Sequence, residues 1–336
     1  MQPSNLHRLS QWPCQDILFC LTANQQGNRI WFGSSDAGVY QLDLNEEKPS
    51  RQKLQGEGHT SYVTSIANCG HSLVTGGYDR KLIWWDAESG NQIRRIQAHE
   101  KWIRRVIVTP DSKHVLSVAD DMQCRLWDAA TGQQVAEFTD HAEMTPHHYP
   151  SMLYAVAVSP EGSHFATGDK VGHVAIWDAQ TLQKVAELET PVMYTWDPKQ
   201  RRHSIGGIRS VAFSSDGRRL AVGGIGKIGN IDHLGGPARL EVFDWHSGER
   251  QLELEDTKWK GLIEQIVWGP DDQWILTTGG DHKGFTTFYD AKSGELVHQE
   301  QQPGHVHALW HDDAYESLFL ASHKQLSHWS MREKEA

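Results

Sequence analysis

The chain has 336 residues, of which 38% are hydrophobic, and a formal net charge of −11 at pH 7. An excess of acidic residues disfavours binding to nucleic acid, which selects proteins with a basic face. No stretch approaches the ~20 apolar residues of a membrane-spanning helix, and the first residues lack the apolar segment of a signal peptide. The composition therefore predicts a cytoplasmic protein with neither a nucleic-acid nor a membrane partner.

Cysteine spacing adds a second exclusion. Cys14, Cys20, Cys69 and Cys124 fit neither a zinc ribbon nor a dense disulfide framework. We expect Cys69 and Cys124 to be reduced, buried small residues.

The first predicted element is a short strand at residues 5–10, which Pro13 ends. Apolar, β-prone runs at residues 17–22, 29–33 and 39–44 follow it, separated by turn-rich segments. No segment of the chain has the periodicity of an amphipathic helix. The sequence thus predicts an all-β protein built from short strands.

A repeated phrase organises the rest of the chain. Residues 76–90 read GGYDRKLIWWDAESG, in which a glycine turn carrying Asp79 leads into a strand that ends in Trp85-Asp86. Copies of the aromatic-Asp pair and its following turn occur at residues 126–132, 176–181, 242–248 and 288–294. Their spacing, mostly about 40 to 50 residues, indicates a repeat architecture.

A second recurring turn fixes the register of the repeats. Residues 109–112 read Thr-Pro-Asp-Ser, and similar turns occur at residues 159–162, 214–217 and 269–272. Proline presets one backbone dihedral of such a turn, and Asp or Ser caps it through its side chain.

The aromatic-Asp pairs, the upstream His59 and His99, and the turn residues Asp79 and Asp121 make the chain similar to the WD-repeat family of β-propellers. This resemblance covers almost the whole chain and implies blades of four antiparallel strands around a central channel. It predicts a seven-bladed propeller that forms one domain over residues 1–336. It implies little about chemistry, because a fold does not fix a function.

The last predicted blade is incomplete, because only residues 305–310, 317–321 and 325–329 read as its strands. The strand at residues 5–10 is spare at the other end of the chain. We expect it to become the outer strand of blade seven, which would close the ring and remove open sheet edges.

The resemblance also implies a hydrogen-bonded network of His, Ser or Thr, Asp and Trp in each well-formed blade. Blade two supplies His59, Thr75, Asp79 and Trp85, and blade three supplies His99, Ser117, Asp121 and Trp127. A Ser-His-Asp set is also the signature of a hydrolase. Its recurrence at the same offsets favours a structural network that satisfies buried polar groups.

The network is expected to fail in the other blades. Blade four has Thr167 and Trp177 but a displaced Asp169, and blade six has Trp259 at the histidine position. In blade seven, His323 stands where Asp is expected.

Two further patterns match ligand-binding motifs only superficially. Residues 224–229 read G-x-G-x-x-G, but the following Asn-Ile-Asp-His-Leu-Gly-Gly-Pro segment cannot be the helix that a nucleotide site requires. His305, His307 and His311 lack a carboxylate at a ligand spacing, and His147-His148 lies in a loop. We therefore predict neither a metal nor a cofactor, and interpret these histidines as solvated or turn residues.

Three insertions, at residues 140–151, 190–206 and 225–237, lengthen loops that the resemblance places at one end of the blades. The second insertion is rich in the residue types of binding hot spots. We predict that a protein or peptide partner contacts Tyr194, Trp196, Arg201 and Arg202, with Trp102 and Tyr62 as secondary contacts. The predicted function is that of a non-catalytic interaction scaffold, monomeric by itself. The alternative is a propeller enzyme, such as a metal-dependent hydrolase acting at the central channel.

Overall fold

The computed structural model describes residues 2–145, 147–148, 150–198 and 203–333. Within these ranges the regular structure is β-strand, apart from three-residue 3-10 helices. None of the helices in the described ranges has the length and apolar character needed to cross a membrane. The chain forms two compact units: the first unit contains residues 1–119, 125–135 and 306–336, and the second contains residues 120–124 and 136–305.

In the first unit, one complete blade is a four-stranded antiparallel sheet in which each strand pairs with the next along the chain. Its strands are β5 (Val63–Asn68), β6 (Ser72–Gly77), β7 (Lys81–Asp86) and β8 (Gln92–Gln97). The interior strands β6 and β7 are buried over most of their length, whereas β8 is largely accessible. The continuous apolar run at residues 82–85 therefore reflects a strand covered on both faces.

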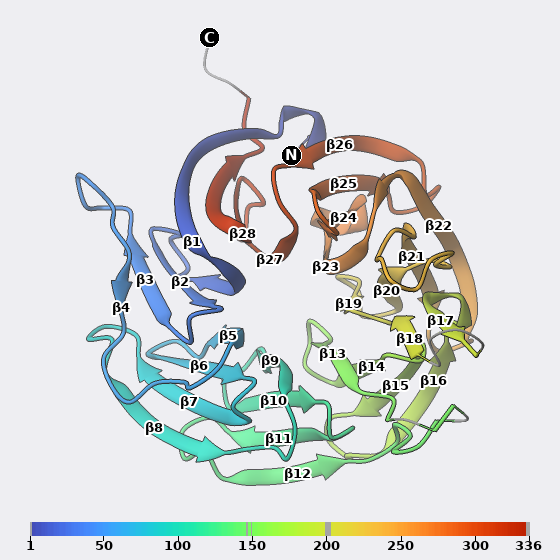
Figure 1. Ribbon diagram of the computed structural model, residues 1–336, viewed down its shortest axis with the longest axis horizontal. Helices are drawn as coiled ribbons and strands as arrows, with labels where there is room; N and C mark the ends of the chain where they lie inside the picture. Colours follow the sequence, from blue (N-terminus) through green and yellow to red (C-terminus); the bar gives the residue numbers. More distant parts are fainter. Residues whose placement is uncertain (1, 146, 149, 199–202, 334–336) are drawn as a thin grey trace. The chain divides into compact units, whose positions relative to one another are not determined.

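The two ends of the chain meet in a six-stranded sheet of order β27-β28-β1-β2-β3-β4 (Figure 1). Its strands are β27 (Val306–His311), β28 (Ser317–Ser330), β1 (His7–Ala23), β2 (Arg29–Ser34), β3 (Val39–Asp43) and β4 (Gln52–Lys53), and the helix η1 (Pro3–Asn5) precedes them. Residues 7–13 of β1 pair with residues 325–330 of β28, while residues 18–23 pair with β2. The N-terminal strand thus extends the last blade, as predicted.

Within the described ranges, six separate sheets have four or more strands, whereas the prediction was seven blades. β28 doubles back at Lys324, whose φ is 60°, and the Met331 N–H donates to the Glu316 carbonyl oxygen at 3.0 Å. One half of β28 pairs with β27 and the other half pairs with β1. Since β1 continues without a break into its pairing with β2, the predicted first and last blades are joined in one sheet.

His328 is expected to make the stability of this sheet depend on pH. Its ring stacks on Phe319 with centroids 4.2 Å apart, and its Nε2 lies 2.7 Å from the Ser317 hydroxyl oxygen. Burial lowers the pKa of His328 from 6.5 to about 4. Between these two values the unfolded chain binds a proton that the folded chain does not, so the free energy of unfolding should fall as the pH decreases from 6.5 to about 4.

The variant His328→Gln tests this prediction, because glutamine keeps polar atoms at the site and does not titrate. Urea unfolding midpoints at pH 7 and pH 5 should show a smaller loss of stability for the variant than for the unchanged chain. Equal losses in the two proteins would mean that His328 contributes nothing to the acid sensitivity.

A further four-stranded sheet has the order β12-β11-β10-β9. It contains β9 (Ile103–Val108), β10 (His114–Ala119), β11 (Cys124–Asp128) and β12 (Gln134–Phe138). β9 and β10 pair antiparallel, with Val115 opposite Val108. The predicted Thr-Pro-Asp-Ser turn connects them, and the Thr109 hydroxyl donates to Asp111 Oδ1 at 2.7 Å.

The second unit contains three more four-stranded antiparallel sheets. The first comprises β13 (Leu153–Val158), β14 (His164–Asp169), β15 (His173–Asp178) and β16 (Lys184–Glu189). The second comprises β19 (Ser210–Phe213), β20 (Arg219–Ile225), β21 (Pro237–Asp244) and β22 (Glu249–Lys260). The third comprises β23 (Leu262–Trp268), β24 (Trp274–Gly280), β25 (Gly284–Asp290) and β26 (Leu296–Gln302), with the helix η3 (Pro270–Asp272) between its first two strands.

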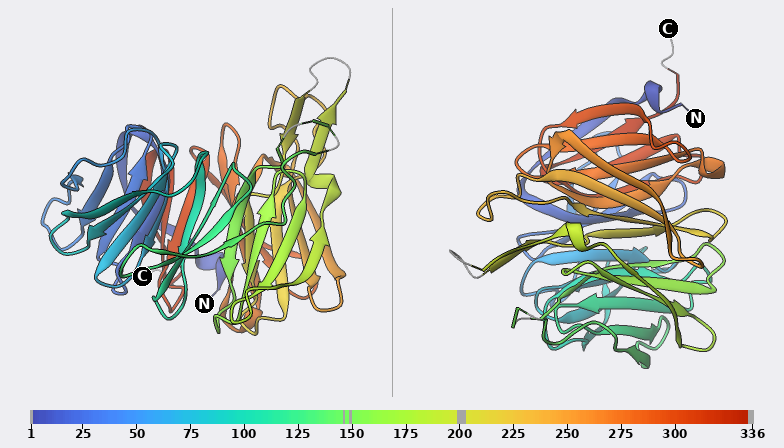
Figure 2. Two further views of the ribbon diagram at one scale, coloured as in Figure 1. Left: turned by 90° about the horizontal axis from the view of Figure 1, so that it is seen from below. Right: turned by 90° about the vertical axis from the view of Figure 1, so that its right-hand side faces the viewer.

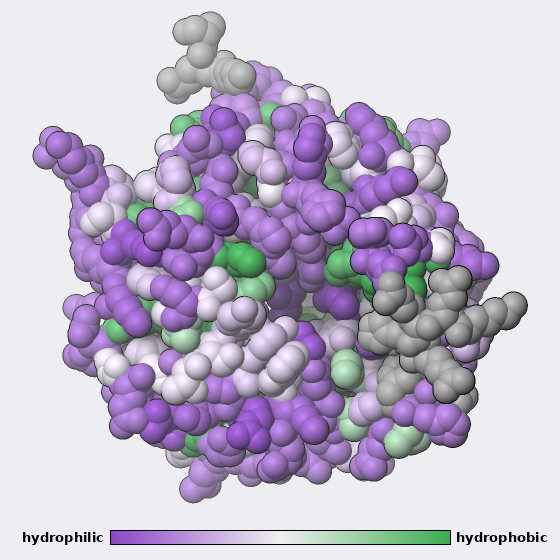
Figure 3. All heavy atoms as spheres, in the orientation of Figure 1, coloured by the Kyte–Doolittle hydropathy of each residue, from purple (hydrophilic) through white to green (hydrophobic). Residues whose placement is uncertain are grey.

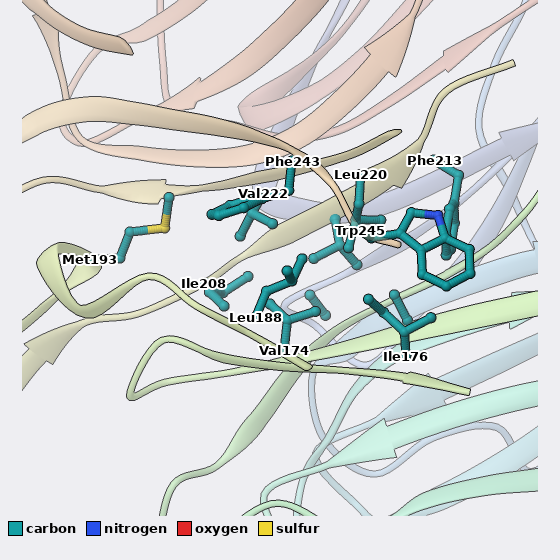
Figure 4. Packing of buried hydrophobic residues seen from close by; sticks show 13 residues of the cluster. Val174, Ile176, Leu188, Met193, Ile208, Phe213, Leu220, Val222, Phe243 and Trp245 are labelled. Carbon is teal, nitrogen blue, oxygen red and sulfur yellow. The ribbon is translucent and has the colours of Figure 1, made fainter. Parts of the chain in front are cut away.

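The insertion at residues 190–206 has a structure that the sequence analysis did not predict. It contains the helix η2 (Pro191–Met193) and a two-stranded hairpin formed by β17 (Tyr194–Asp197) and β18 (His203–Gly206). The hairpin projects beyond the sheets of the second unit (Figure 2). At its base, Met193 is fully buried in the hydrophobic core beside Ile208 and Val222 (Figure 4). This buried anchor ties the insertion to the neighbouring sheets.

Candidate functional site

The predicted network of blade two is present. His59 Nδ1 lies 2.9 Å from Asp79 Oδ1, and His59 Nε2 lies 2.7 Å from the Thr75 hydroxyl oxygen. A carboxylate only accepts hydrogen bonds, so Nδ1 carries the proton and Nε2 accepts from the Thr75 O–H. The Trp85 indole N–H donates to the same hydroxyl oxygen at 2.9 Å. A Cβ at Gly77 would lie only 2.7 Å from the Tyr62 carbonyl oxygen, which explains why glycine occupies this turn.

The network of blade two is buried, and its carboxylate is held by several hydrogen bonds. Burial alone would raise the pKa of Asp79, but hydrogen bonds from His59 and from the Thr60 and Lys81 amides hold it below its usual value. The Thr75 side chain is completely buried and receives the indole N–H of Trp85. A hydroxyl that is shielded in this way cannot reach a substrate as a nucleophile.

Blade three repeats the central part of the network. His99 Nε2 lies 2.7 Å from the Ser117 hydroxyl oxygen, which accepts from the Trp127 indole N–H at 2.8 Å. Ser117 is fully buried, as is its counterpart in blade two. The Asp121 carboxylate accepts the Gln123 N–H at 3.2 Å.

Blade four corrects the expectation that the network fails there. His141 Nδ1 lies 3.0 Å from Asp169 Oδ2, and His141 Nε2 lies 2.8 Å from the Thr167 hydroxyl oxygen. The Trp177 indole N–H donates to that hydroxyl oxygen at 3.1 Å. His141 is the functional equivalent of His59, and sequence reasoning missed it because it lies within the stretch interpreted as an insertion.

Blade six does not form the network through the residues predicted from its sequence. The Thr277 hydroxyl donates to the Thr287 carbonyl oxygen at 3.4 Å, and the Trp259 indole N–H is buried without a hydrogen bond within the described ranges. In the last blade, the ring of His323 stacks on His307 with centroids 4.9 Å apart. These positions agree with the expectation that the network would not extend to either blade.

The three insertions contact one another in the second unit. His147, from the first insertion, stacks on Trp196 with ring centroids 4.5 Å apart, and its Nδ1 lies 3.0 Å from the Tyr194 hydroxyl oxygen. The Ile228 N–H, from the third insertion, donates to the Thr195 hydroxyl oxygen at 3.1 Å. His147 was interpreted as a solvated or turn residue; it lies in a turn, half-buried, where it joins two insertions.

The contacts between insertions involve two of the predicted partner-binding residues. Tyr194 and Trp196 are both half-buried, and burial raises the pKa of Tyr194 to about 12. Arg201 and Arg202 lie outside the described residues. Met144, on the first insertion, has 62% of its surface accessible.

The other two predicted contacts, Tyr62 and Trp102, belong to a row of aromatic side chains in the first unit. We call Phe19, Tyr62, Tyr78 and Trp102 the aromatic row. Consecutive ring centroids along it are 5.4, 5.5 and 4.3 Å apart, and the last pair of rings is nearly parallel, with an interplanar angle of 7°. Figure 3 shows pale residues of intermediate hydropathy gathered over β5 and β9, where the row lies.

Exposure alternates along the aromatic row. Trp102 is 48% exposed and Tyr62 is 44% exposed, whereas Phe19 and Tyr78 are half-buried beneath them. The Arg104 guanidinium lies 5.5 Å from the Trp102 ring centroid and 5.0 Å from that of Tyr78. It also donates a hydrogen bond to the Tyr78 hydroxyl. A cation placed against these rings stabilises their positions.

The backbone beneath the row is also held in place. The Tyr78 N–H donates to the Tyr62 carbonyl oxygen at 2.9 Å. The Thr64 hydroxyl donates to the Ile103 carbonyl oxygen at 2.7 Å, which links the inner strands of two blades just behind Tyr62 and Trp102. The two exposed rings therefore stand on a preformed support.

The opposite ends of the same inner strands form an open pocket of about 960 Å³. Its polar lining includes the turn residues Asn24, Gln25, Gln26 and Asn68. Asn24 Oδ1 accepts the N–H groups of Asn28 and Arg29, and Asn68 donates to the Ala23 carbonyl oxygen. Because Asn24 and Asn68 hold their own loops, exposed Gln25 is the better position for a control substitution.

One group of possible metal ligands lies in the second unit, formed by Asp140, His173 and Glu187. The Lys184 ammonium lies between the carboxylates, 2.7 Å from Asp140 Oδ1 and 2.8 Å from Glu187 Oε2. His173 uses Nε2 to contact Asp140 at 2.9 Å and Nδ1 to contact Glu189 at 2.6 Å. This is the arrangement of an ion-pair cluster, because the lysine already supplies the positive charge.

Repeated four-stranded antiparallel sheets with buried His–hydroxyl–Asp–Trp networks define an all-β propeller. Residues 50–86, 90–128 and 197–227 match the family described as "WD domain, G-beta repeat". These matches and the relatives below support a WD-repeat β-propeller.

The chain is similar to WD-repeat proteins with diverse names. It is 31% identical over 152 residues to nuclear distribution protein PAC1 of Arthroderma benhamiae, which covers 40% of this chain and 33% of that protein. It is 26% identical over 218 residues to eukaryotic translation initiation factor 3 subunit I of Candida albicans, covering 62% of this chain and 54% of that protein. It is 25% identical over 257 residues to telomerase protein component 1 of Mus musculus, covering 76% of this chain but 8% of that protein. The matched region thus spans only a third of the PAC1 relative.

Proposed function

We propose that the chain is a non-catalytic platform that binds a protein or peptide partner. Two of the relatives are named as a subunit and a component of larger assemblies, which supports a role based on protein contacts. The buried hydroxyl groups of Thr75 and Ser117 argue against the alternative use of the His-hydroxyl-Asp sets in hydrolysis. Burial also raises the pKa of the Cys20 thiol to about 12, which disfavours a reactive thiolate.

The observation that carries the proposal is the exposure of Tyr62 and Trp102 on a rigid support. Both side chains are more than two-fifths accessible, although each has a large apolar surface. Tyr and Trp lose little conformational entropy on binding, and they are enriched among the residues that contribute most to interfaces. A partner that covers these two rings would gain apolar burial without ordering the surface first.

The insertions of the second unit form a second candidate surface. Tyr194 and Trp196 remain partly accessible on the projecting hairpin, and exposed Met144 lies on the insertion that contacts it. Their packing against His147 means that a substitution would also loosen the contact between insertions. We therefore expect smaller binding losses per residue here than at Trp102.

Affinity capture followed by quantitative mass spectrometry tests the proposal. The unchanged chain should retain a specific partner that Tyr62→Ala/Trp102→Ala loses and that the matched variants Ile93→Ala and Gln25→Ala keep. Ile93 is a suitable control because it is 53% exposed on β8, in the same unit. A partner lost with Tyr194→Ala/Trp196→Ala instead would move the site to the insertions. No partner sensitive to either double variant would contradict the proposal.

A further inference from the structure

We propose that the aromatic row binds a proline-rich segment in the polyproline II conformation. This inference rests on the proposed function and specifies the partner that the first unit recognises. Its basis is the spacing, the exposure and the hydrogen-bonding groups of the row.

The aromatic row is short enough for one polyproline II segment to reach both of its exposed rings. The ring centroids of Tyr62 and Trp102 lie 5.5 and 4.3 Å from that of Tyr78, so the two exposed rings are separated by no more than the combined distance. A polyproline II helix repeats every three residues, with a rise of about 3.1 Å per residue. Residues i and i+3 of such a segment therefore return to the same face over about 9 Å, so four residues are long enough to lie along both rings.

The exposed rings also carry hydrogen-bond donors that can pair with the backbone carbonyl oxygens of such a segment. Among the described residues, no hydrogen bond engages the Tyr62 hydroxyl or the Trp102 indole N–H. A polyproline II backbone has no internal hydrogen bonds, so its carbonyl oxygens remain available as acceptors. Aromatic-lined surfaces with such donors are the general means by which Pro-rich segments are bound.

The positive charge of Arg104 beside the aromatic row favours a bound segment that carries an acidic residue. Arg104 lies against both Trp102 and Tyr78 and places a guanidinium at this end of the surface. An acidic residue next to the prolines would gain a favourable interaction there, whereas a basic residue would be repelled. We therefore expect the bound segment to combine prolines spaced by three residues with an adjacent Asp or Glu.

A display library of random 16-residue peptides tests the inference without a known partner. Selection on the unchanged chain should enrich peptides with two prolines three residues apart. A synthetic copy of the strongest peptide should bind Trp102→Ala at least tenfold more weakly and bind Ile93→Ala unchanged. Tyr62→Phe, which keeps the ring and loses only the hydroxyl, should weaken binding less than Tyr62→Ala.

Three outcomes would overturn the inference. Enriched peptides that need Tyr62 and Trp102 but lack proline would refute the polyproline ligand and leave the proposed binding function intact. Proline-rich peptides that bind Tyr62→Ala/Trp102→Ala as well as the unchanged chain would show that the row is not their site. Failure to enrich any peptide would refute recognition of a short segment, while the capture experiment would still test the binding function separately.

Discussion

Deletion of residues 1–11 is expected to destabilise the protein severely and to cause aggregation. The deletion removes the backbone pairing between the start of β1 and β28, including His7 opposite Ser330 and Gln11 opposite Ser327. Each lost hydrogen bond costs about 0.5–1.5 kcal/mol, so several together should lower the free energy of unfolding by about 3–5 kcal/mol. The edge of β28 would then be open to pairing with another molecule.

Thermal unfolding and size-exclusion chromatography would measure both effects. The matched control is Leu9→Ser, which retains the backbone pairing and alters a side chain that is 53% exposed. This control should change the stability by no more than about 0.5 kcal/mol. A shortened chain that melts at the original temperature and elutes as a single species would refute the role of this strand.

The second large effect is expected at Trp85. Its side chain is 2% exposed, lies in a hydrophobic cluster and donates its indole N–H to Thr75. Trp85→Ala would leave a cavity and remove one of the two hydrogen bonds of the Thr75 hydroxyl to His59 and Trp85, and should lower the free energy of unfolding by about 3–5 kcal/mol. Asp79→Ala, which removes the acceptor of His59 and of the Thr60 and Lys81 amides, should cost about 1–3 kcal/mol.

Trp102→Ala provides the matched control for the tryptophan substitution. The same chemical change at a side chain that is 48% exposed should affect the stability far less than at Trp85. Chemical denaturation of the three variants would rank them. Equal losses at Trp85 and Trp102, or a neutral Asp79→Ala, would show that the network does not stabilise blade two.

The networks of blades two and three could be predicted from the sequence because their residues keep a regular spacing. The His59–Thr75 and His99–Ser117 contacts join residues 16 and 18 positions apart, respectively. In blade four, the corresponding His141–Thr167 contact spans 26 positions, because an insertion separates the two. Asp169 also follows Thr167 by two residues, whereas Asp79 follows Thr75 by four. The constant ten-residue offset from hydroxyl to tryptophan was the signal that could have indicated an intact network in blade four.

Contacts between loops that are far apart in the sequence could not be predicted from the sequence. The stacking of His147 on Trp196 joins segments that share no periodic pattern, and it depends on how the chain passes around intervening strands. The aromatic row has the same character, since its members come from strand β1, from two positions just before strands and from a turn. Tyr62 and Trp102 were selected by residue type and position, whereas the supporting Phe19 and Tyr78 required the folded structure.

For the joined first and last blades, the pairing of the N-terminal strand was predicted correctly, but its length was not. The sequence correctly predicted that an N-terminal strand pairs with the last blade, because that blade lacked a strand. It did not predict that β1 would run from His7 to Ala23 as one element, since Pro13 read as a break. Proline is tolerated at this position because it pairs with Gln325 at a register irregularity, where a regular ladder is already interrupted.

The most direct test of the binding account is the dissociation constant of the captured partner for the unchanged chain and for Trp102→Ala, measured by calorimetry. The account predicts a loss of about 2 kcal/mol or more, which corresponds to about thirtyfold weaker binding. The variant should retain the melting temperature of the unchanged chain. An unchanged dissociation constant for Trp102→Ala, together with an unchanged constant for Tyr62→Ala, would contradict the account.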